Sequence, residues 1–307
     1  MAVPPIALPP TLVSVDLDDV GCYHAIHGLT APESVHAGVG WSHWLPRFLD
    51  LFANTGVRAT FFVIGRDLAR DQERGGPGAA ALRRAIAEGH ELGNHSFSHA
   101  YDLVRWSAER QRRDLAACDA LLRELGADVM GFRAPGYSHD AGLLSAAAAL
   151  GYRYDSSSLP SPLYYAAKLM VMGAMALRGE RSSSLADHAR SFLGTRHPHR
   201  REDVPLLELP MSVSPVVRVP LIGTSLLASP RPVSRWLRRS ARSLPHLHLE
   251  LHGIDLACPD GDPIADALCH RQPELRVPLA KRAGRLEQLL RARGGGSPLR
   301  DAIDAVS

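Results

Sequence analysis

Short apolar runs alternate with longer helical patterns along most of this chain, and this alternation constrains the fold more than any other feature. The runs LVSVDL (residues 12–17) and RATFFVIG (58–65) have the length and composition of buried strands. Between them, the pattern at 43–56 is typical of a helix that ends at a glycine. Strands that alternate with helices over short connections form a mostly parallel sheet. We therefore expect an α/β fold.

The same alternation continues toward the C-terminal end. Further strands are expected at 128–135, 152–157, 205–212 and 246–253, and further helices at 78–90, 107–126, 140–151 and 278–294. Residues 158–204 break the pattern, because they are long, rich in Ser and Arg, and contain the apolar stretch 163–177. We interpret 158–204 as an insertion or cap over the strand ends. The prediction is one domain over 1–295 and a C-terminal tail over 296–307.

Composition excludes several classes of protein. With 45% hydrophobic and 22% charged residues, the 307-residue chain can bury a core and is not disordered. The net charge is only +3, aromatic residues make up 6%, and no basic-aromatic motif is present, so we expect no nucleic-acid partner. Arginines concentrate at 178–201 and at 235–242, and the second stretch is consistent with a basic surface helix.

The expected location follows from cysteines and targeting signals. The four cysteines are far apart and form no CxxC pair, which favours a reducing compartment. The first residues lack the basic and apolar regions of a signal peptide. The stretch 163–177 is interrupted by Lys168 and is shorter than the ~18–20 apolar residues of a membrane span. We expect a cytoplasmic protein, with 163–177 able to lie on the inner face of the membrane.

Polar residues that could take part in catalysis or metal binding lie where the expected strands end. In VDLDDVG, Asp16, Asp18 and Asp19 follow an apolar strand, and crowded carboxylates repel one another unless a cation neutralises them. Asp16 and Asp18 share one face of a strand, so one can bind a metal while the other accepts a proton from water. The alternative is a helix N-cap with two solvated acids.

The histidines of HSFSH, His95 and His99, are four residues apart. On a helical turn this spacing puts both imidazoles on one face, where they can reach one ion. Two histidines and one aspartate leave coordination positions open, as in a catalytic divalent-metal site. The alternative is two unrelated histidines in a histidine-rich chain.

Two further stretches can supply acid, base and oxyanion groups. GFRAPGYS (131–138) is expected to form a rigid turn after a strand, with Arg133 able to orient a carboxylate and backbone N–H groups available to an oxyanion. His252 ends an apolar strand and could act as a general acid, held protonated by Asp155. The alternatives are an ordinary loop, a structural histidine and a helix cap.

In combination and in this order, the motifs resemble those of the polysaccharide deacetylase family, the NodB-homology enzymes of carbohydrate esterase family four. HSFSH is a full match to the family's His-Ser/Thr-x-x-His motif, and VDLDDVG looks like its first motif. FRAPGYS, YDSSS and LHGIDL are similar to its third, fourth and fifth motifs. The resemblance covers roughly 12–157 and 205–256.

The resemblance implies a distorted (β/α) barrel of about seven parallel strands and one divalent ion, with zinc expected and cobalt or nickel as alternatives. It implies that metal-activated water attacks an acetamide carbonyl. The implied metal ligands are Asp18, His95 and His99. The implied catalytic groups are Asp16 as base, Arg133 as the partner of that base, the Tyr137 N–H at the oxyanion, and His252 paired with Asp155 as the acid.

The first motif departs from the family pattern of two adjacent aspartates followed by glycine. Here there are three acids, and Val20 stands where the glycine would be. Two registers fit: Asp16 as base with Asp18 as ligand, or Asp18 as base with Asp19 as ligand. Strand alternation favours the first.

Three functions remain to be separated. The first is N-deacetylation of an amino sugar that is polymeric, oligomeric or lipid-linked. The second is hydrolysis of a non-sugar amide by the same fold. The third is a non-catalytic carbohydrate-binding barrel, which the retained acids and histidines argue against.

Overall fold

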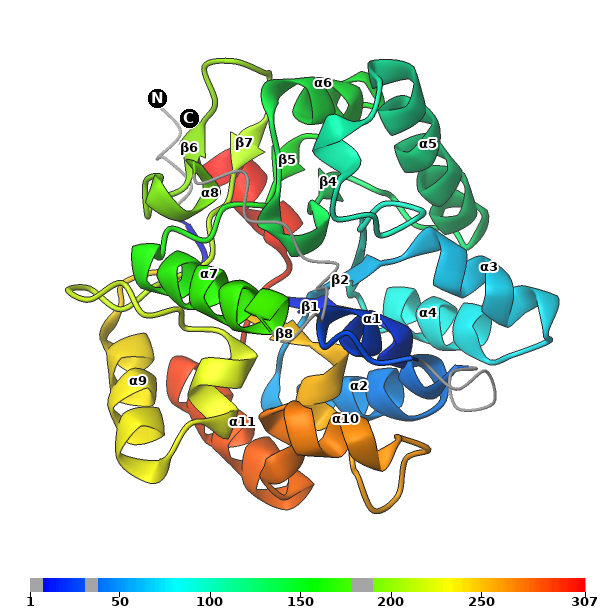
Figure 1. The fold of residues 1–307 in the computed structure, drawn as a ribbon. Helices are drawn as coiled ribbons and strands as arrows, with labels where there is room; N and C mark the ends of the chain where they lie inside the picture. The colour runs from blue at the N-terminus through cyan, green and yellow to red at the C-terminus, as the bar shows by residue number, and fades with distance from the viewer. Residues whose placement is uncertain (1–7, 31–37, 178–189, 307) are drawn as a thin grey trace.

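The computed structural model describes residues 8–30, 38–177 and 190–306. Within this part, eight strands form one curled sheet in the order β6-β7-β5-β4-β3-β2-β1-β8, surrounded by helices (Figure 1). The seven strands other than β6 pair in parallel, and β6 is antiparallel to β7. The predicted α/β fold, a distorted barrel with seven parallel strands, is therefore confirmed. The strands are β1 (Thr11–Asp16), β2 (Thr60–Val63), β3 (Glu91–Asn94), β4 (Gly131–Phe132), β5 (Tyr154–Asp155), β6 (His199–Arg200), β7 (Leu207–Glu208) and β8 (Leu247–His252).

The helices pack on the outside of the sheet and occupy most of the places that the sequence predicts. They are α1 (Val20–Ile26), α2 (Leu45–Thr55), α3 (Gly65–Glu73), α4 (Gly78–Ala87), α5 (Ala108–Glu124), α6 (Ala141–Ala149), α7 (Pro162–Leu177), α8 (Arg190–Leu193), α9 (Arg231–Ser243), α10 (Asp266–Arg271) and α11 (Leu279–Arg293). Helix α2 ends as expected at Gly56, whose φ of 68° suits a residue without a side chain. Helix α9 forms the basic surface helix expected around 235–242.

Alternation along the central strands separates the apolar core from the polar interior. In β1, Val13 and Val15 belong to the main hydrophobic cluster with Phe48 of α2. The residues between them face the other side, where Ser14 pairs in register with Glu250 and Asp16 pairs with His252. Polar side chains from β1 and β8 therefore converge inside the curled sheet.

The segment predicted as a C-terminal tail is packed against the barrel. The backbone of Ser297 donates to Thr11 O (2.9 Å) and accepts from Val13 N (3.0 Å), which extends the hydrogen bonding of β1. The 3₁₀ helix Leu299–Ala305 follows, and Leu299 and Ile303 are buried. This segment belongs to the domain because its apolar residues fill the barrel end.

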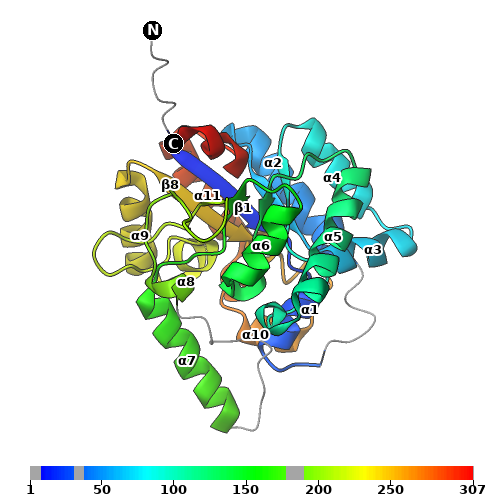
Figure 2. The ribbon, with the colours of Figure 1, turned by 90° about the horizontal axis from the view of Figure 1, so that it is seen from above.

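The insertion, residues 158–204, contains α7, α8 and β6. Figure 2 shows α7 standing away from the rest of the molecule. Residues 178–189 of the insertion, which include two of its six arginines, lie outside the described residues. In the described part of the chain, each helix is either too short or too polar to cross a membrane.

Candidate active site

A pocket of about 330 Å³ opens at the carboxyl ends of the central strands. Parallel α/β sheets place their functional groups at this end. Its floor holds acids and histidines, and its walls are mostly aromatic and apolar. The lining residues are Asp16, Asp18, Tyr23, Ile26, His27, His95, His99, Tyr101, Gly136, Tyr137, Tyr164, Ala167, Lys168, Val171, Met172 and His252.

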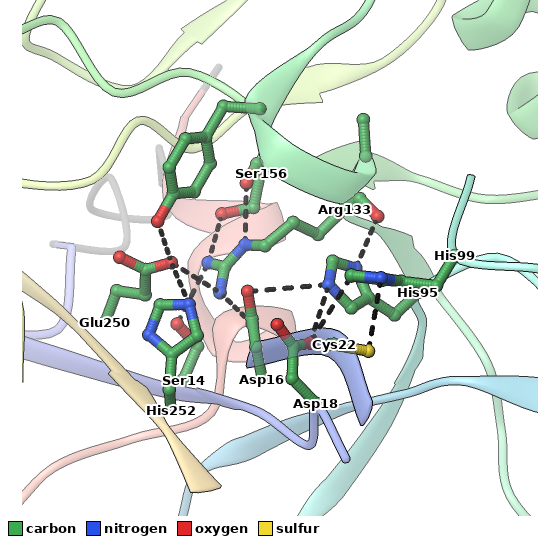
Figure 3. A network of polar contacts seen from close by, with 12 residues as sticks. Ser14, Asp16, Asp18, Cys22, His95, His99, Arg133, Ser156, Glu250 and His252 are labelled. Atoms are coloured by element: carbon green, nitrogen blue, oxygen red, sulfur yellow. Dashed lines mark hydrogen bonds and ion pairs between the residues drawn. The ribbon is translucent and has the colours of Figure 1, made fainter. Parts of the chain in front are cut away.

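Asp16 and Arg133 form a buried ion pair at the centre of the floor (Figure 3). Arg133 Nη1 donates to Asp16 Oδ1 at 2.5 Å, and its Nη2 donates to Ser14 Oγ (2.9 Å) and Ser156 Oγ (2.8 Å). The guanidinium also lies over the ring of Phe62, 4.3 Å from its centre. These contacts hold Arg133 rigidly, so the orientation of the Asp16 carboxylate is fixed.

Asp18, His95 and His99 come together as the sequence predicts. Asp18 Oδ1 lies 3.5 Å from His95 Nε2 and 3.4 Å from His99 Nε2. The two imidazole rings are 4.9 Å apart at an angle of 60°. All three side chains are buried, and one nitrogen or oxygen atom of each lies within 4.8 Å of the others.

The two histidines are brought together by a loop, and the predicted helical turn is wrong. Ser96 and His99 have φ values of 62° and 51°, in the left-handed region. Side chains stabilise this backbone: Asn94 Oδ1 accepts from Ser96 N (2.8 Å), and Ser96 Oγ accepts from His99 N (2.8 Å). Asp114 of α5 accepts from the two N–H groups between them, those of Phe97 and Ser98.

The donor set fits a divalent cation. Asp18 Oδ1 is buried and has no hydrogen-bond partner among the described residues. His95 Nδ1 contacts the carbonyl of Arg133 (2.8 Å), which directs Nε2 toward Asp18. His99 Nδ1 lies 3.6 Å from the Cys22 thiol, and burial lowers the pKa of His99 to about 4, so its imidazole is neutral at pH 7. A neutral imidazole is the form that binds a metal.

Asp19 does not face this site. Its carboxylate accepts from Val20 N (2.8 Å) and caps the N-terminus of α1. Burial, followed by the nearby Asp67 carboxylate, raises the pKa of Asp19 to about 7. The geometry therefore favours the register with Asp16 and Asp18 as the functional pair.

His252 lies on the opposite side of Asp16 from the two histidines (Figure 3). It ends β8, and its backbone N–H donates to Asp255 Oδ2 (2.9 Å) in the turn that follows. Burial alone would lower its pKa, but the carboxylates of Glu250, Asp16 and Asp18 outweigh burial and raise it to about 9. His252 is therefore protonated at neutral pH.

The carboxylate beside His252 is Glu250, and the predicted pairing with Asp155 does not form. Glu250 Oε1 lies 3.9 Å from His252 Nε2 and 3.9 Å from Arg133 Nη1, and it accepts from the Tyr137 hydroxyl at 2.8 Å. Glu250 is fully buried. Glu250 was not predicted from the sequence. It stands two residues before His252 and therefore lies on the same face of the strand.

Asp155 belongs to a neighbouring buried cluster. It is in register with Glu208 of β7, and its Oδ1 accepts from Ser157 Oγ (2.6 Å). Arg201 donates to Glu208 Oε2 (3.0 Å) and contacts His139 Nε2 (3.4 Å). The positive charge of the Arg201 guanidinium offsets the negative charge of this buried cluster. Asp155 therefore stabilises the ends of strands β5 and β7.

Tyr137 sits at the turn that the sequence predicts after β4. Gly136 and Tyr137 both have positive φ, 59° and 64°. The Tyr137 N–H, predicted to face an oxyanion, donates to Ala134 O at 3.1 Å within this turn. Its hydroxyl, by contrast, connects the turn to Glu250. The oxyanion role of the N–H remains a prediction.

Part of the chain is similar in sequence to known proteins. A family model described as polysaccharide deacetylase matches residues 38–154, which include both histidines of the pocket floor and Arg133. A chitin deacetylase of Colletotrichum lindemuthianum is 33% identical over 119 residues, 39% of this chain and 47% of that protein. A chitooligosaccharide deacetylase of Bradyrhizobium sp. is 43% identical over 60 residues, 20% of this chain and 24% of that protein. The chain thus matches less than half the length of these relatives.

A solved structure extends the likeness of fold beyond the matched segment. A protein of Mycobacterium smegmatis assigned to the polysaccharide deacetylases superposes with a TM-score of 0.61 and 17% identity, covering 100% of this chain and 94% of that one. At this identity the likeness concerns the fold alone. The likeness of fold thus covers the whole chain, and the sequence match to the polysaccharide deacetylase family covers residues 38–154.

Proposed function

We propose that this chain is a metal-dependent hydrolase that removes the acetyl group from an N-acetylated amino sugar. The observation that carries the proposal is the arrangement of the pocket floor. A three-donor cluster, a carboxylate fixed by an arginine and a protonated histidine line one pocket within the distances given above. Amide hydrolysis needs these three functions: an electrophile, a base and an acid.

Asp18, His95 and His99 would hold the cation. The nitrogen and oxygen donors of these three residues suit zinc, and cobalt or nickel would fit the same set. When bound, a divalent cation polarises the amide carbonyl and makes a water molecule more acidic. The three residues lie beside Asp16, since His95 Nε2 is 3.7 Å from Asp16 Oδ2, so a cation that they hold would lie next to the proposed base.

Asp16 acts as the base in this proposal. Arg133 binds its Oδ1, which leaves Oδ2 on the side of the three-donor cluster to take a proton from water. The positive guanidinium stabilises the charged carboxylate and orients it. His252 then gives its proton to the nitrogen of the leaving amine, since its raised pKa keeps it protonated until that step.

The pocket walls support a sugar as the substrate. Four tyrosines line the pocket: Tyr23, Tyr101, Tyr137 and Tyr164. Aromatic rings offer apolar faces with a polar edge, which suit the mixed surface of a sugar ring. The sugar is polymeric, oligomeric or lipid-linked, and the apolar residues that α7 contributes to the pocket wall favour the lipid-linked form. Hydrolysis of a non-sugar amide is the second candidate, because the floor alone does not distinguish the two.

Metal content and acetate release test the proposal together. We expect about one divalent ion per chain in the purified protein and almost none in His95→Ala/His99→Ala, measured by elemental analysis. We also expect acetate release from N-acetylchitooligosaccharides by the parent only. A metal-loaded parent that hydrolyses simple amides but no N-acetyl sugar would favour the second candidate. A parent without metal after incubation with zinc, cobalt and nickel would favour a non-catalytic binding barrel.

A further inference from the structure

Helix α7 exposes an apolar surface that a water-facing helix does not normally carry. Of its sixteen residues only Lys168 is charged. Five of the ten large hydrophobic side chains that are exposed in the described part of the chain belong to α7, among them Met170 (70% exposed) and Leu177 (92%). In Figure 2 the helix projects from the side of the barrel on which α1 lies, and residues of both helices line the pocket. An exposed apolar surface of this kind is typical of a site that binds another protein, a membrane or a ligand.

The exposed apolar residues extend around the helix. Leu169, Met170 and Val171 are consecutive and all exposed. Successive residues are about 100° apart on a helix, so these three cover roughly 200° of its circumference. A helix that packs on a protein with one face presents an apolar stripe of about 100° or somewhat more, and an apolar surface all round is typical of a helix that is fully buried in a core or a membrane. A helix that is apolar over a wider arc fits hydrocarbon, which surrounds it from several sides.

The same helix forms a wall of the proposed active site. Tyr164, Lys168, Val171 and Met172 line the pocket together with the acids and histidines of the floor. Lys168 places its ammonium 3.5 Å from Gly136 O, so the one charge of α7 lies on the pocket side. Val171 lines the pocket and is 60% exposed, so the apolar surface of α7 continues from the exterior into the pocket.

We propose that α7 inserts into one leaflet of a lipid bilayer, and that the substrate is an acetamido sugar whose lipid chain lies along this helix. At a 1.5 Å rise per residue the helix is about 24 Å long, and it is shorter than the ~20 residues needed to span a bilayer. The membrane part of the proposal, insertion of α7 into a leaflet, does not depend on the proposed deacetylase function. The substrate part rests on the proposed deacetylase function and narrows it to lipid-borne sugars.

Sedimentation with vesicles of pure phosphatidylcholine tests the membrane part. Neutral lipid is needed because the arginines of α9 would bind anionic lipid through charge alone. We expect the parent to sediment with the vesicles, and Leu169→Glu/Met170→Glu to partition at least about tenfold more weakly, since buried carboxylates are costly in hydrocarbon. Neither residue lines the pocket, so acetate release from a soluble chitooligosaccharide should be unchanged.

A matched control uses the same change of charge on another helix. Ala117 and Ala120 are exposed on α5, which lies across the barrel from α7 in both views. Ala117→Glu/Ala120→Glu should bind vesicles as the parent does. The inference is overturned if the parent stays in the supernatant, or if the α7 variant binds as well as the parent. It is equally overturned if the α7 variant merely dissociates a dimer of the parent in the absence of lipid.

Two glycosides of N-acetylglucosamine test the substrate part. In the presence of vesicles, we expect the parent to deacetylate a dodecyl glycoside with a kcat/KM at least about tenfold above that of the methyl glycoside, because both partners share the bilayer surface. This preference should disappear in Leu169→Glu/Met170→Glu. Equal rates in the parent would overturn the substrate part. If neither glycoside nor chitooligosaccharide is hydrolysed, the proposed function fails, while vesicle binding still decides the membrane part.

Discussion

At the scale of single residues, two aspartates two positions apart carry different contacts and therefore different expected roles. Asp16 is bound by Arg133, and Asp18 faces His95 and His99. We predict that Asp16→Asn keeps its metal and loses turnover by at least about 10²-fold, the usual contribution of a general base. Asp18→Asn should lose both metal and turnover. Elemental analysis and acetate release measure the two effects separately.

Asp19 provides the control for this pair. Asp19→Asn should retain metal and activity, because asparagine also caps a helix N-terminus and the side chain points to α1. Near-full activity of Asp16→Asn, or loss of metal in Asp19→Asn, would instead support the register with Asp18 as base and Asp19 as ligand.

Glu250 gives a second prediction at this scale, through the pH dependence of the reaction. Its carboxylate helps to raise the pKa of His252 to about 9, against the lowering effect of burial. Protonated His252 donates a proton, so activity should fall as the pH rises through about 9. In Glu250→Gln this charge is absent, the pKa of His252 is lower, and the basic limb of the kcat profile should move to lower pH.

The control for Glu250 is the equally buried carboxylate of Glu208. Glu208 pairs with Arg201 in the neighbouring cluster. Glu208→Gln should leave the basic limb of the kcat profile where it is in the parent. If Glu250→Gln also leaves it there, Glu250 has only a structural role through Tyr137 and Arg133.

At the scale of elements, the turn after β4 depends on a glycine for two reasons. Gly136 has a φ of 59°, and a Cβ placed there would lie 2.5 Å from Tyr101 Cδ1. Tyr101 packs edge-on against His99, with ring centres 5.2 Å apart. We predict that Gly136→Ala lowers the free energy of unfolding by more than about 1 kcal/mol and weakens metal binding, because Tyr101 and His99 must move.

Gly151 provides the control that separates backbone strain from the contact with Tyr101. Its φ is 84°, but a Cβ there would meet no atom within 4 Å. Gly151→Ala should therefore show the cost of backbone strain without a change in metal affinity. Urea unfolding and metal titration of both variants make the comparison, and equal metal affinity in the two would refute the role assigned to Tyr101.

The order of the elements could be predicted from the sequence because a run of apolar residues indicates a buried segment. It overestimated strand lengths: the run at 128–135 contains a strand of only Gly131–Phe132. Burial continues beyond the hydrogen-bonded ladder, so a run of apolar residues does not mark where pairing ends. The antiparallel strand β6 was not predicted, since His199–Arg200 carries no apolar pattern.

The candidate site was predictable where its residues come from ordered motifs, and less so where contacts depend on the three-dimensional arrangement. The spacing of His95 and His99 suggested a helix, but Asn94 and Asp114 accept hydrogen bonds from backbone N–H groups and stabilise a loop with left-handed residues, which no periodicity reveals. Asp155 was paired with His252 on motif order alone. Strand register decides this pairing, because it aligns Asp155 with Glu208 and puts Glu250 on the face of His252.

At the scale of the whole molecule, the C-terminal segment closes the end of the barrel opposite the pocket. Leu299 is fully buried against Leu12, Phe62 and Tyr154, in a cluster that joins strands β1, β2 and β5. We predict that Leu299→Ala lowers the free energy of unfolding by about 2–5 kcal/mol, as removal of a buried leucine side chain usually does. Urea denaturation followed by circular dichroism measures this change.

The neighbouring exposed residue Asp301 provides the comparison, and Asp301→Ala should stay within about 0.5 kcal/mol of the parent. Acetate release in the absence of urea should be retained by both variants, because the cluster lies under the strands and contributes no residue to the pocket. If Leu299→Ala unfolds at the same urea concentration as the parent, Leu299 adds nothing to stability, as expected of the C-terminal tail predicted over 296–307. A loss of stability would instead make the last residues of the chain part of what holds β1, and with it Asp16, in place.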